Sequence, residues 1–111
     1  MAEIWTMGET LVEIMRTEVD KPLNETGLFS GPYPSGSSAI MISTVARMGH
    51  SCGIISGVGK DGFGECMLNR LKKDGVDVSK VLVDPDGSTA WAFVAYDSEG
   101  DRRYLFHWDE T

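Results

Sequence analysis

The sequence predicts an α/β fold, because helix-like and strand-like segments alternate along its central part. A helix-like apolar run ends at Gly49, and a strand-like run, residues 51–56, follows it. The glycine-rich turn 57–64 then opens a second helix-like segment that closes near Gly75. Two later strand-like segments, joined by a short loop that contains glycine, predict an added β-hairpin.

The first third of the chain is expected to be largely extended. Apolar runs at residues 4–7 and 11–15 predict two short strands with a turn or bulge between them. Residues 17–27 are polar and contain proline, asparagine and glycine, which predicts a loop. Residues 28–33 are expected to form an edge segment, because the prolines in and beside it cannot donate to a central ladder.

The first helix is predicted over residues 38–48 from the spacing of its apolar residues. Three of them recur at i, i+4 and i+7, namely Met41, Val45 and Met48. Ser37 or Ser38 is expected to cap its start, since a serine hydroxyl accepts a hydrogen bond from an unpaired helical N–H.

A buried strand, a second helix and a short strand are predicted after residue 50. Residues 51–58 have the apolar character of a buried strand, and residues 80–83 that of a short one. The helix is expected over residues 63–73, with Asp61 as its N-cap and Gly75 as its terminator. Its apolar stripe consists of Phe63, Met67, Leu68 and Leu71.

Aromatic residues gather on the predicted hairpin, whose strands are residues 89–96 and 102–108. Alternation along a strand groups them into two sets, Trp91 with Phe93, and Tyr104 with Phe106 and Trp108. An aromatic sheet face is typical of a core or a subunit interface. It also suits the apolar side of a sugar ring, and the residues alone leave both interpretations open.

Length and charge restrict the classes of function. With 111 residues, 41% hydrophobic and 24% charged, the chain is one globular domain or part of one. Ten basic against seventeen acidic residues give a net charge of −7, which argues against nucleic acid or an anionic membrane as a partner. We find no signal-peptide pattern and no run of about 20 apolar residues, so the cytoplasm is the expected location.

The usual motifs for metals and nucleophiles are missing from the sequence. Cys52 and Cys66 form no Cys-x-x-Cys pair, and both are expected to be reduced core residues. His50 and His107 lack the spacing of metal ligands, so no metal site is expected. There is also no Gly-x-x-x-x-Gly-Lys-Ser/Thr loop for phosphate and no Gly-x-Ser-x-Gly elbow.

Two segments that contain glycine are candidates for binding. The pattern Gly57-x-Gly59-x-x-Gly62 matches the dinucleotide fingerprint. However, Asp61 places a carboxylate where a pyrophosphate has to approach the helix, which favours a purely structural turn. Before the first helix, Ser35-Gly36-Ser37-Ser38 offers N–H groups and hydroxyls that suit an anion or sugar hydroxyls, with a simple N-cap as the alternative.

In their order, these segments resemble the amino-terminal portion of the pfkB (ribokinase-like) carbohydrate kinases. Gly8-Glu9-Thr10-Leu11-Val12-Glu13 and Pro32-Tyr33-Pro34-Ser35-Gly36 are most similar to 2-keto-3-deoxygluconate-kinase-like and fructokinase-like members. The resemblance implies a mostly parallel sheet flanked by helices, with a small antiparallel β lid. It further implies that residues 1–111 form an incomplete domain, with lid strands at about 10–34 and 88–108 and an α/β part at about 36–84.

The resemblance also implies a substrate site for a sugar or sugar acid. The residues that it implies are Glu13, Ser35, Gly36, Ser37, Ile40, Phe106 and Trp108. The acidic residue at the position of Glu13 accepts hydrogen bonds from sugar hydroxyls in these kinases. Ile40 stands where the family has an asparagine, and it is expected to give an apolar wall that favours a deoxy or keto-deoxy position.

The implied activity is transfer of the ATP γ-phosphoryl group to a sugar or sugar-acid hydroxyl with Mg²⁺. The family's catalytic base lies in a Gly-Ala-Gly-Asp motif that this sequence lacks. We therefore expect no catalytic, ATP-binding or metal-binding residue in this chain, which would be the sugar-binding half of a kinase. A homo-oligomer through the lid strands is expected, and a non-catalytic sugar-binding or interaction fragment is the alternative.

Overall fold

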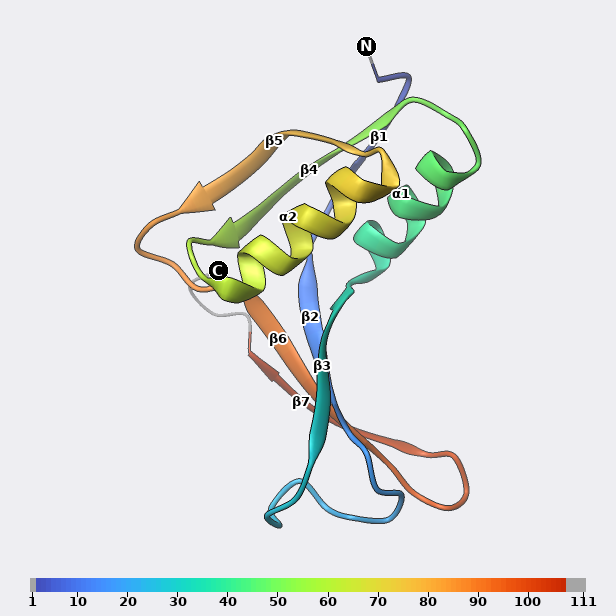
Figure 1. Cartoon of the computed structure of the whole chain (residues 1–111), viewed down its shortest axis with the longest axis vertical. Helices are drawn as coiled ribbons and strands as arrows, with labels where there is room; N and C mark the ends of the chain where they lie inside the picture. Colours follow the sequence, from blue (N-terminus) through green and yellow to red (C-terminus); the bar gives the residue numbers. More distant parts are fainter. Residues whose placement is uncertain (1, 108–111) are drawn as a thin grey trace.

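The computed structural model describes residues 2–107, which form seven strands and two helices (Figure 1). In chain order they are β1 (Ile4–Met7), β2 (Leu11–Arg16), β3 (Phe29–Ser35), α1 (Ser37–Arg47), β4 (Cys52–Gly59), α2 (Gly62–Asp74), β5 (Asp77–Asp84), β6 (Ala90–Tyr96) and β7 (Arg102–His107). Each predicted strand and helix is present. The strand predicted at residues 80–83 is longer than expected and begins at Asp77.

The strands form two sheets, a body sheet and a lid sheet that projects from it (Figure 1). The body sheet has the order β1-β4-β5 and is entirely parallel. The lid sheet has the order β3-β2-β6-β7, in which β2 is antiparallel to β3 and β6 to β7. However, β2 and β6 are parallel, because each continues from a strand of the parallel body sheet. The predicted α/β fold with a lid is confirmed, although the lid is a mixed sheet.

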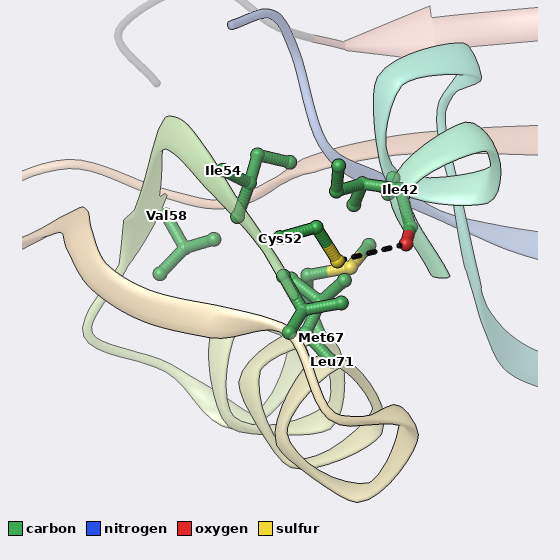
Figure 2. Packing of buried hydrophobic residues seen from close by; sticks show 8 residues of the cluster. Ile42, Cys52, Ile54, Val58, Met67 and Leu71 are labelled. Atoms are coloured by element: carbon green, nitrogen blue, oxygen red, sulfur yellow. Dashed lines mark hydrogen bonds between the residues drawn. The ribbon is translucent and has the colours of Figure 1, made fainter. Parts of the chain in front are cut away.

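Both helices cover one face of the body sheet, and the main core lies between the helices and this face (Figures 1 and 2). Its largest buried side chains are Ile42 of α1, Ile54 and Val58 of β4, and Met67 and Leu71 of α2. Burying a side chain of this size stabilises the fold by about 1.5–3 kcal/mol. The buried Cys52 thiol donates to the Ile42 carbonyl over 3.5 Å, and burial raises the pKa of that thiol. Cys66, expected in the core, is only half-buried.

The opposite face of the body sheet stays open within the described residues. Its apolar side chains are Trp5 and Met7 of β1, Ile55 of β4 and Leu82 of β5, with exposed fractions of 40%, 76%, 42% and 70%. The strand register places them together, since Met7 lies opposite Ile55 and Leu82 opposite Gly57. Parallel sheets are normally covered on both faces, so this surface is suited to further structure.

The start and the buried side of α1 differ from the prediction. Ala39 and Ile42 are buried and Val45 and Ala46 are partly buried against them, whereas the expected stripe residues Met41 and Met48 are exposed. Apolar residues occur on both sides of this helix at helical spacing, and only the position of β4 selects the buried side. The predicted serine cap is also wrong, because Gly36 is the N-cap and no side chain caps the helix.

The ends of α2 and the place of β3 agree with the prediction. The Asp61 carboxylate accepts a hydrogen bond from the Gly64 N–H over 2.8 Å, as an N-cap does. Gly75 ends the helix in the left-handed conformation, with φ 97°. β3 is an edge strand of the lid sheet, which is where its two prolines are tolerated.

Candidate functional site

A hollow of about 230 Å³ lies at the carboxyl end of β1, beside the second half of β4 and the start of the lid sheet. It is lined by Gly8, Glu9, Thr10, Ser56, Gly57 and Ala90. The Thr10 hydroxyl lies 3.3 Å from the Ser56 hydroxyl and donates to the Gly57 carbonyl over 3.4 Å. In open α/β sheets, ligands bind outside the carboxyl ends of the strands, so this hollow is the first candidate site.

One face of the lid sheet continues from this hollow and carries Glu13. Glu13 lies opposite Tyr33 of β3 and opposite Ala92 of β6, and Ala92 lies opposite Phe106 of β7. Paired residues in neighbouring strands share a face, so these four side chains form one row across the lid. Ala90, two residues before Ala92, is on the same face and also lines the hollow. The hollow and the Glu13 face are therefore continuous.

The chain between β3 and α1 lies directly against the residues that line the hollow. Gly36 adopts φ 97°, and a Cβ atom there would lie 2.9 Å from the Glu9 carbonyl oxygen. Glycine is therefore needed both for the backbone conformation and for this close approach. On the other side, a Cβ atom at Gly8 would collide with the Ser38 hydroxyl. The start of α1 is thus held beside Gly8 and Glu9.

The structure brings most of the predicted site residues together. Glu13 and Phe106 share a lid face, and Ser35, opposite Leu11, leads into Gly36 and Ser37 at the base of the same region. Ile40 is not among them, although we predicted it there. It is 56% exposed and lines a separate hollow of about 140 Å³ between α1 and α2. Trp108 lies outside the described residues.

Within the described residues, Trp91 and Phe93 lie on one face of the lid, and Tyr104 and Phe106 lie on the other. Phe93 packs edge-on against both Phe29 and Trp91, with ring centres 5.2 Å apart in each pair, and Trp91 stacks on His107. On the Glu13 face, Tyr104 and Phe106 stack with centres 5.1 Å apart and are 41% and 45% exposed. One set therefore packs within the lid, while the other presents ring faces on the candidate site.

The Arg102 guanidinium is fixed at the outer end of the Glu13 face. It donates to the Tyr104 hydroxyl over 2.9 Å and lies 5.5 Å from the centre of the Tyr96 ring. The hydrogen bond to the Tyr104 hydroxyl, followed by electrostatic interactions with Tyr104, Tyr96 and Glu13, raises the pKa of Arg102. Arg102 pairs with Tyr96, four residues along β6 from Ala92, so it begins about 13 Å along the strand from the Glu13 row.

The glycine-rich turn between β4 and α2 is closed by protein groups. The Asp61 carboxylate accepts three hydrogen bonds, from the Gly64 N–H, the Thr89 N–H and the Thr89 hydroxyl, over 2.8, 3.0 and 2.7 Å. Desolvation raises the pKa of Asp61, but these hydrogen bonds outweigh it and the pKa lies below its ordinary value. A dinucleotide pyrophosphate or an ATP phosphate does not fit here, because the Asp61 carboxylate already occupies the start of α2.

Several residues of this region were missed by sequence reasoning. Tyr33, Thr10 and Ser56 were not selected, because only the strand register and the meeting of β1 with β4 bring them to the site. Thr89 was likewise not linked to Asp61, from which it is 28 residues away. Among residues 2–107, no group of three or more potential metal ligands occurs. Neither helix of this described part is long and apolar enough to cross a membrane.

Comparison with protein families gives a match over residues 1–111, to the family described as pfkB family carbohydrate kinase. A fructokinase of Salmonella typhimurium is 32% identical over 105 residues, which are 95% of this chain and 32% of that protein. A 5-dehydro-2-deoxygluconokinase of Clostridium perfringens is 34% identical over 87 residues, which are 78% of this chain and 25% of that protein. The chain spans about a third of the length of these curated relatives or less.

Solved structures with the same fold include an E. coli protein provisionally described as ribokinase II. Its apo form superimposes with a TM-score of 0.96 at 45% identity, over 99% of this chain and 35% of that one. Its complex with ATP and Mg²⁺ gives a TM-score of 0.92 at 47% identity, over 96% of this chain and 34% of that one. The lid and the body thus have the arrangement found in a ribokinase-type structure.

Proposed function

Because this chain belongs to the pfkB family of carbohydrate kinases, we propose that it forms the sugar-binding part of an ATP-dependent sugar or sugar-acid kinase. The observation that carries the proposal is the continuity between the hollow beside Gly8 and the lid face that presents Glu13. A ligand there contacts both the body and the lid. The kinase transfers the ATP γ-phosphoryl group to a hydroxyl of the ligand, and this chain holds and orients that acceptor.

Glu13 is the proposed anchor for the sugar hydroxyls. Its carboxylate accepts hydrogen bonds from two neighbouring hydroxyls, and bonds to a charged acceptor are stronger than neutral ones. At the other end, the N–H groups of Gly36 or Ser37 donate to a sugar oxygen, since the first N–H groups of a helix have no partner within it. Phe106 packs against the apolar side of the sugar, and Ser35 supports the turn.

The remaining partners follow from the family. ATP and Mg²⁺ are the proposed cofactors of the longer kinase, supported by the E. coli structure that contains both. This chain alone is proposed to bind neither and to have no catalytic residue. We also propose self-association through the lid strands, which expose Leu105 on the face opposite Glu13. The two unpaired thiols suit a reducing compartment, which supports the cytoplasm as the location.

A non-catalytic sugar-binding or interaction fragment is the second candidate. The observation behind it is that the sequence lacks the Gly-Ala-Gly-Asp motif of the family's catalytic base. The two candidates differ in whether a longer polypeptide completes the kinase. The sequence of the complete reading frame separates them by the presence or absence of a Gly-Ala-Gly-Asp motif.

Sugar binding by the isolated chain tests the proposed site. We would titrate the chain with D-fructose, D-ribose and 2-keto-3-deoxygluconate by isothermal titration calorimetry. We would then repeat the titration with Glu13→Gln, which keeps the shape of the side chain and removes its charge. Loss of a charged hydrogen bond weakens binding by about 1.5–3 kcal/mol. Unchanged affinity of Glu13→Gln for a sugar that binds the wild type would place the site elsewhere.

A further inference from the structure

Tyr33 is the register partner of Glu13 in the lid sheet. The two residues lie opposite each other in the β2–β3 pair, so their side chains stand next to each other on one face. Tyr33 is 45% exposed, and its hydroxyl has no hydrogen-bond partner among residues 2–107. Beside the Glu13 carboxylate, the exposed ring offers an apolar surface and its hydroxyl offers a donor and an acceptor.

The row that contains Tyr33 ends in a second exposed aromatic residue. Tyr33 stands on β3 and Phe106 on β7, with Glu13 and Ala92 between them. The outer strands of four are about 14 Å apart, since neighbouring strands lie about 4.8 Å apart. A sugar ring with van der Waals contacts of about 4 Å on either side spans most of that distance. Ala92 carries only a methyl group and is fully buried by its neighbours, so the sugar ring would lie further out, between the exposed parts of Tyr33 and Phe106.

We infer that Tyr33 is a specificity-determining residue of the sugar site and forms an aromatic wall opposite Phe106. This inference rests on the proposed function of the Glu13 face. The two walls favour a ring-form sugar, whose apolar C–H groups pack on the aromatic faces while its hydroxyl edge reaches Glu13. The Tyr33 hydroxyl adds a donor and acceptor for a further sugar oxygen.

The charges around the row favour a neutral ligand at this position. Glu13 is the only charged member of the row, and Glu9 lines the adjoining hollow. The cation fixed on the same face is Arg102, whose guanidinium is held by the Tyr104 hydroxyl and whose charge already interacts with that of Glu13. A carboxylate on the sugar is therefore repelled by the carboxylates of Glu13 and Glu9. For this reason a neutral ring sugar binds there more tightly than a sugar acid.

Saturation-transfer NMR of the whole chain with D-fructose tests the inference. Tyr33→Leu removes the ring, Tyr33→Phe keeps it, and Leu82→Ala is the control, because Leu82 lies on the open face of the body sheet and is 70% exposed. We expect Tyr33→Leu to weaken D-fructose binding by about fivefold or more, with Leu82→Ala within about twofold of the wild type. Tyr33→Phe should retain most of the affinity. Circular dichroism of each variant confirms that it is folded.

The outcomes separate this inference from the proposed function. If Glu13→Gln loses D-fructose binding while Tyr33→Leu keeps it, the role of Tyr33 is refuted and the sugar site stands. If both variants bind like the wild type, the sugar lies elsewhere and both are refuted, as they are if the wild type binds no sugar. Binding of 2-keto-3-deoxygluconate more tightly than D-fructose would refute the preference for a neutral ring.

Discussion

The link between Asp61 and Thr89 predicts a large loss of stability when the carboxylate is removed. Asp61 caps α2 and also accepts two hydrogen bonds from Thr89, the residue before β6, so it joins the body to the lid. Thr89 is 1% exposed, and Asp61→Ala leaves its N–H without this acceptor and away from water. Asp61→Ala therefore removes the helix cap and also leaves the buried Thr89 N–H without a hydrogen-bond acceptor.

The expected magnitude follows from these three bonds. The helix cap contributes about 1 kcal/mol, and a hydrogen bond to a charged acceptor about 1.5–3 kcal/mol. The terms overlap because they share one carboxylate, so we expect Asp61→Ala to lower the free energy of unfolding by about 3–4 kcal/mol. Asp86→Ala is the matched control, since Asp86 is exposed, and it should stay within about 0.5 kcal/mol of the wild type.

Urea unfolding, followed by tryptophan fluorescence and circular dichroism, measures this change. Thr89→Val tests the same link from the other side, because it removes the hydroxyl that donates to Asp61 and accepts from the Gly59 N–H over 3.0 Å. It should be destabilising by about 2 kcal/mol. A loss below about 1 kcal/mol for Asp61→Ala would refute a stabilising link between body and lid.

The lowered pKa of Asp61 gives the same prediction a pH dependence. A carboxyl group with a lower pKa in the folded state stabilises the fold above its unfolded pKa of about 3.9. That stability is lost as the pH falls through the folded pKa. The difference in unfolding free energy between wild type and Asp61→Asn should therefore be constant from pH 5 upward and shrink below about pH 4. A difference that stays constant down to pH 2 would contradict the pKa shift.

Three further predictions concern the turn, the assembly and the activity. Gly36→Ala should lower the free energy of unfolding by about 1–3 kcal/mol, because a side chain is strained at φ 97° and meets the Glu9 carbonyl. Thermal unfolding measures this loss, and an unchanged unfolding midpoint would contradict the close approach of Gly36 to Glu9. The chain should form a dimer or larger species, and sedimentation equilibrium should show Leu105→Ser to be less associated than the wild type; a monomeric wild type at high concentration would exclude the lid interface. The isolated chain should not phosphorylate D-fructose, D-ribose or 2-keto-3-deoxygluconate in a coupled ATP assay, and reproducible turnover would disprove this.

Local signals in the sequence were sufficient for much of the fold. Asp61 and Gly75 define the ends of α2 through residues only a few positions away, so their roles are readable without any tertiary information. The prolines of β3 likewise mark an edge strand. The buried side of α1 was mispredicted, because methionines on one side and isoleucine with alanine on the other both follow the helical period.

Contacts between residues that are distant in the chain could not be predicted from the sequence. The row that places Tyr33 beside Glu13 depends on the register of β2 and β3, which are joined by a loop of twelve residues between Arg16 and Phe29. Ile40 was placed wrongly for the same reason, since its surroundings depend on contacts between distant residues. Its position in the motif indicated the sugar site, yet the helix turns it towards the hollow between α1 and α2.

Mapping of sugar binding by ¹H–¹⁵N NMR tests the central claim most directly. Amide shifts of the assigned chain would be followed during titration with D-fructose. The account predicts changes concentrated at the hollow and on the Glu13 face, in residues 8–13, 33–37, 90–92 and 104–106. Changes confined to the other hollow, around Arg47 and Arg70 between α1 and α2, or spread evenly over the chain, would contradict it.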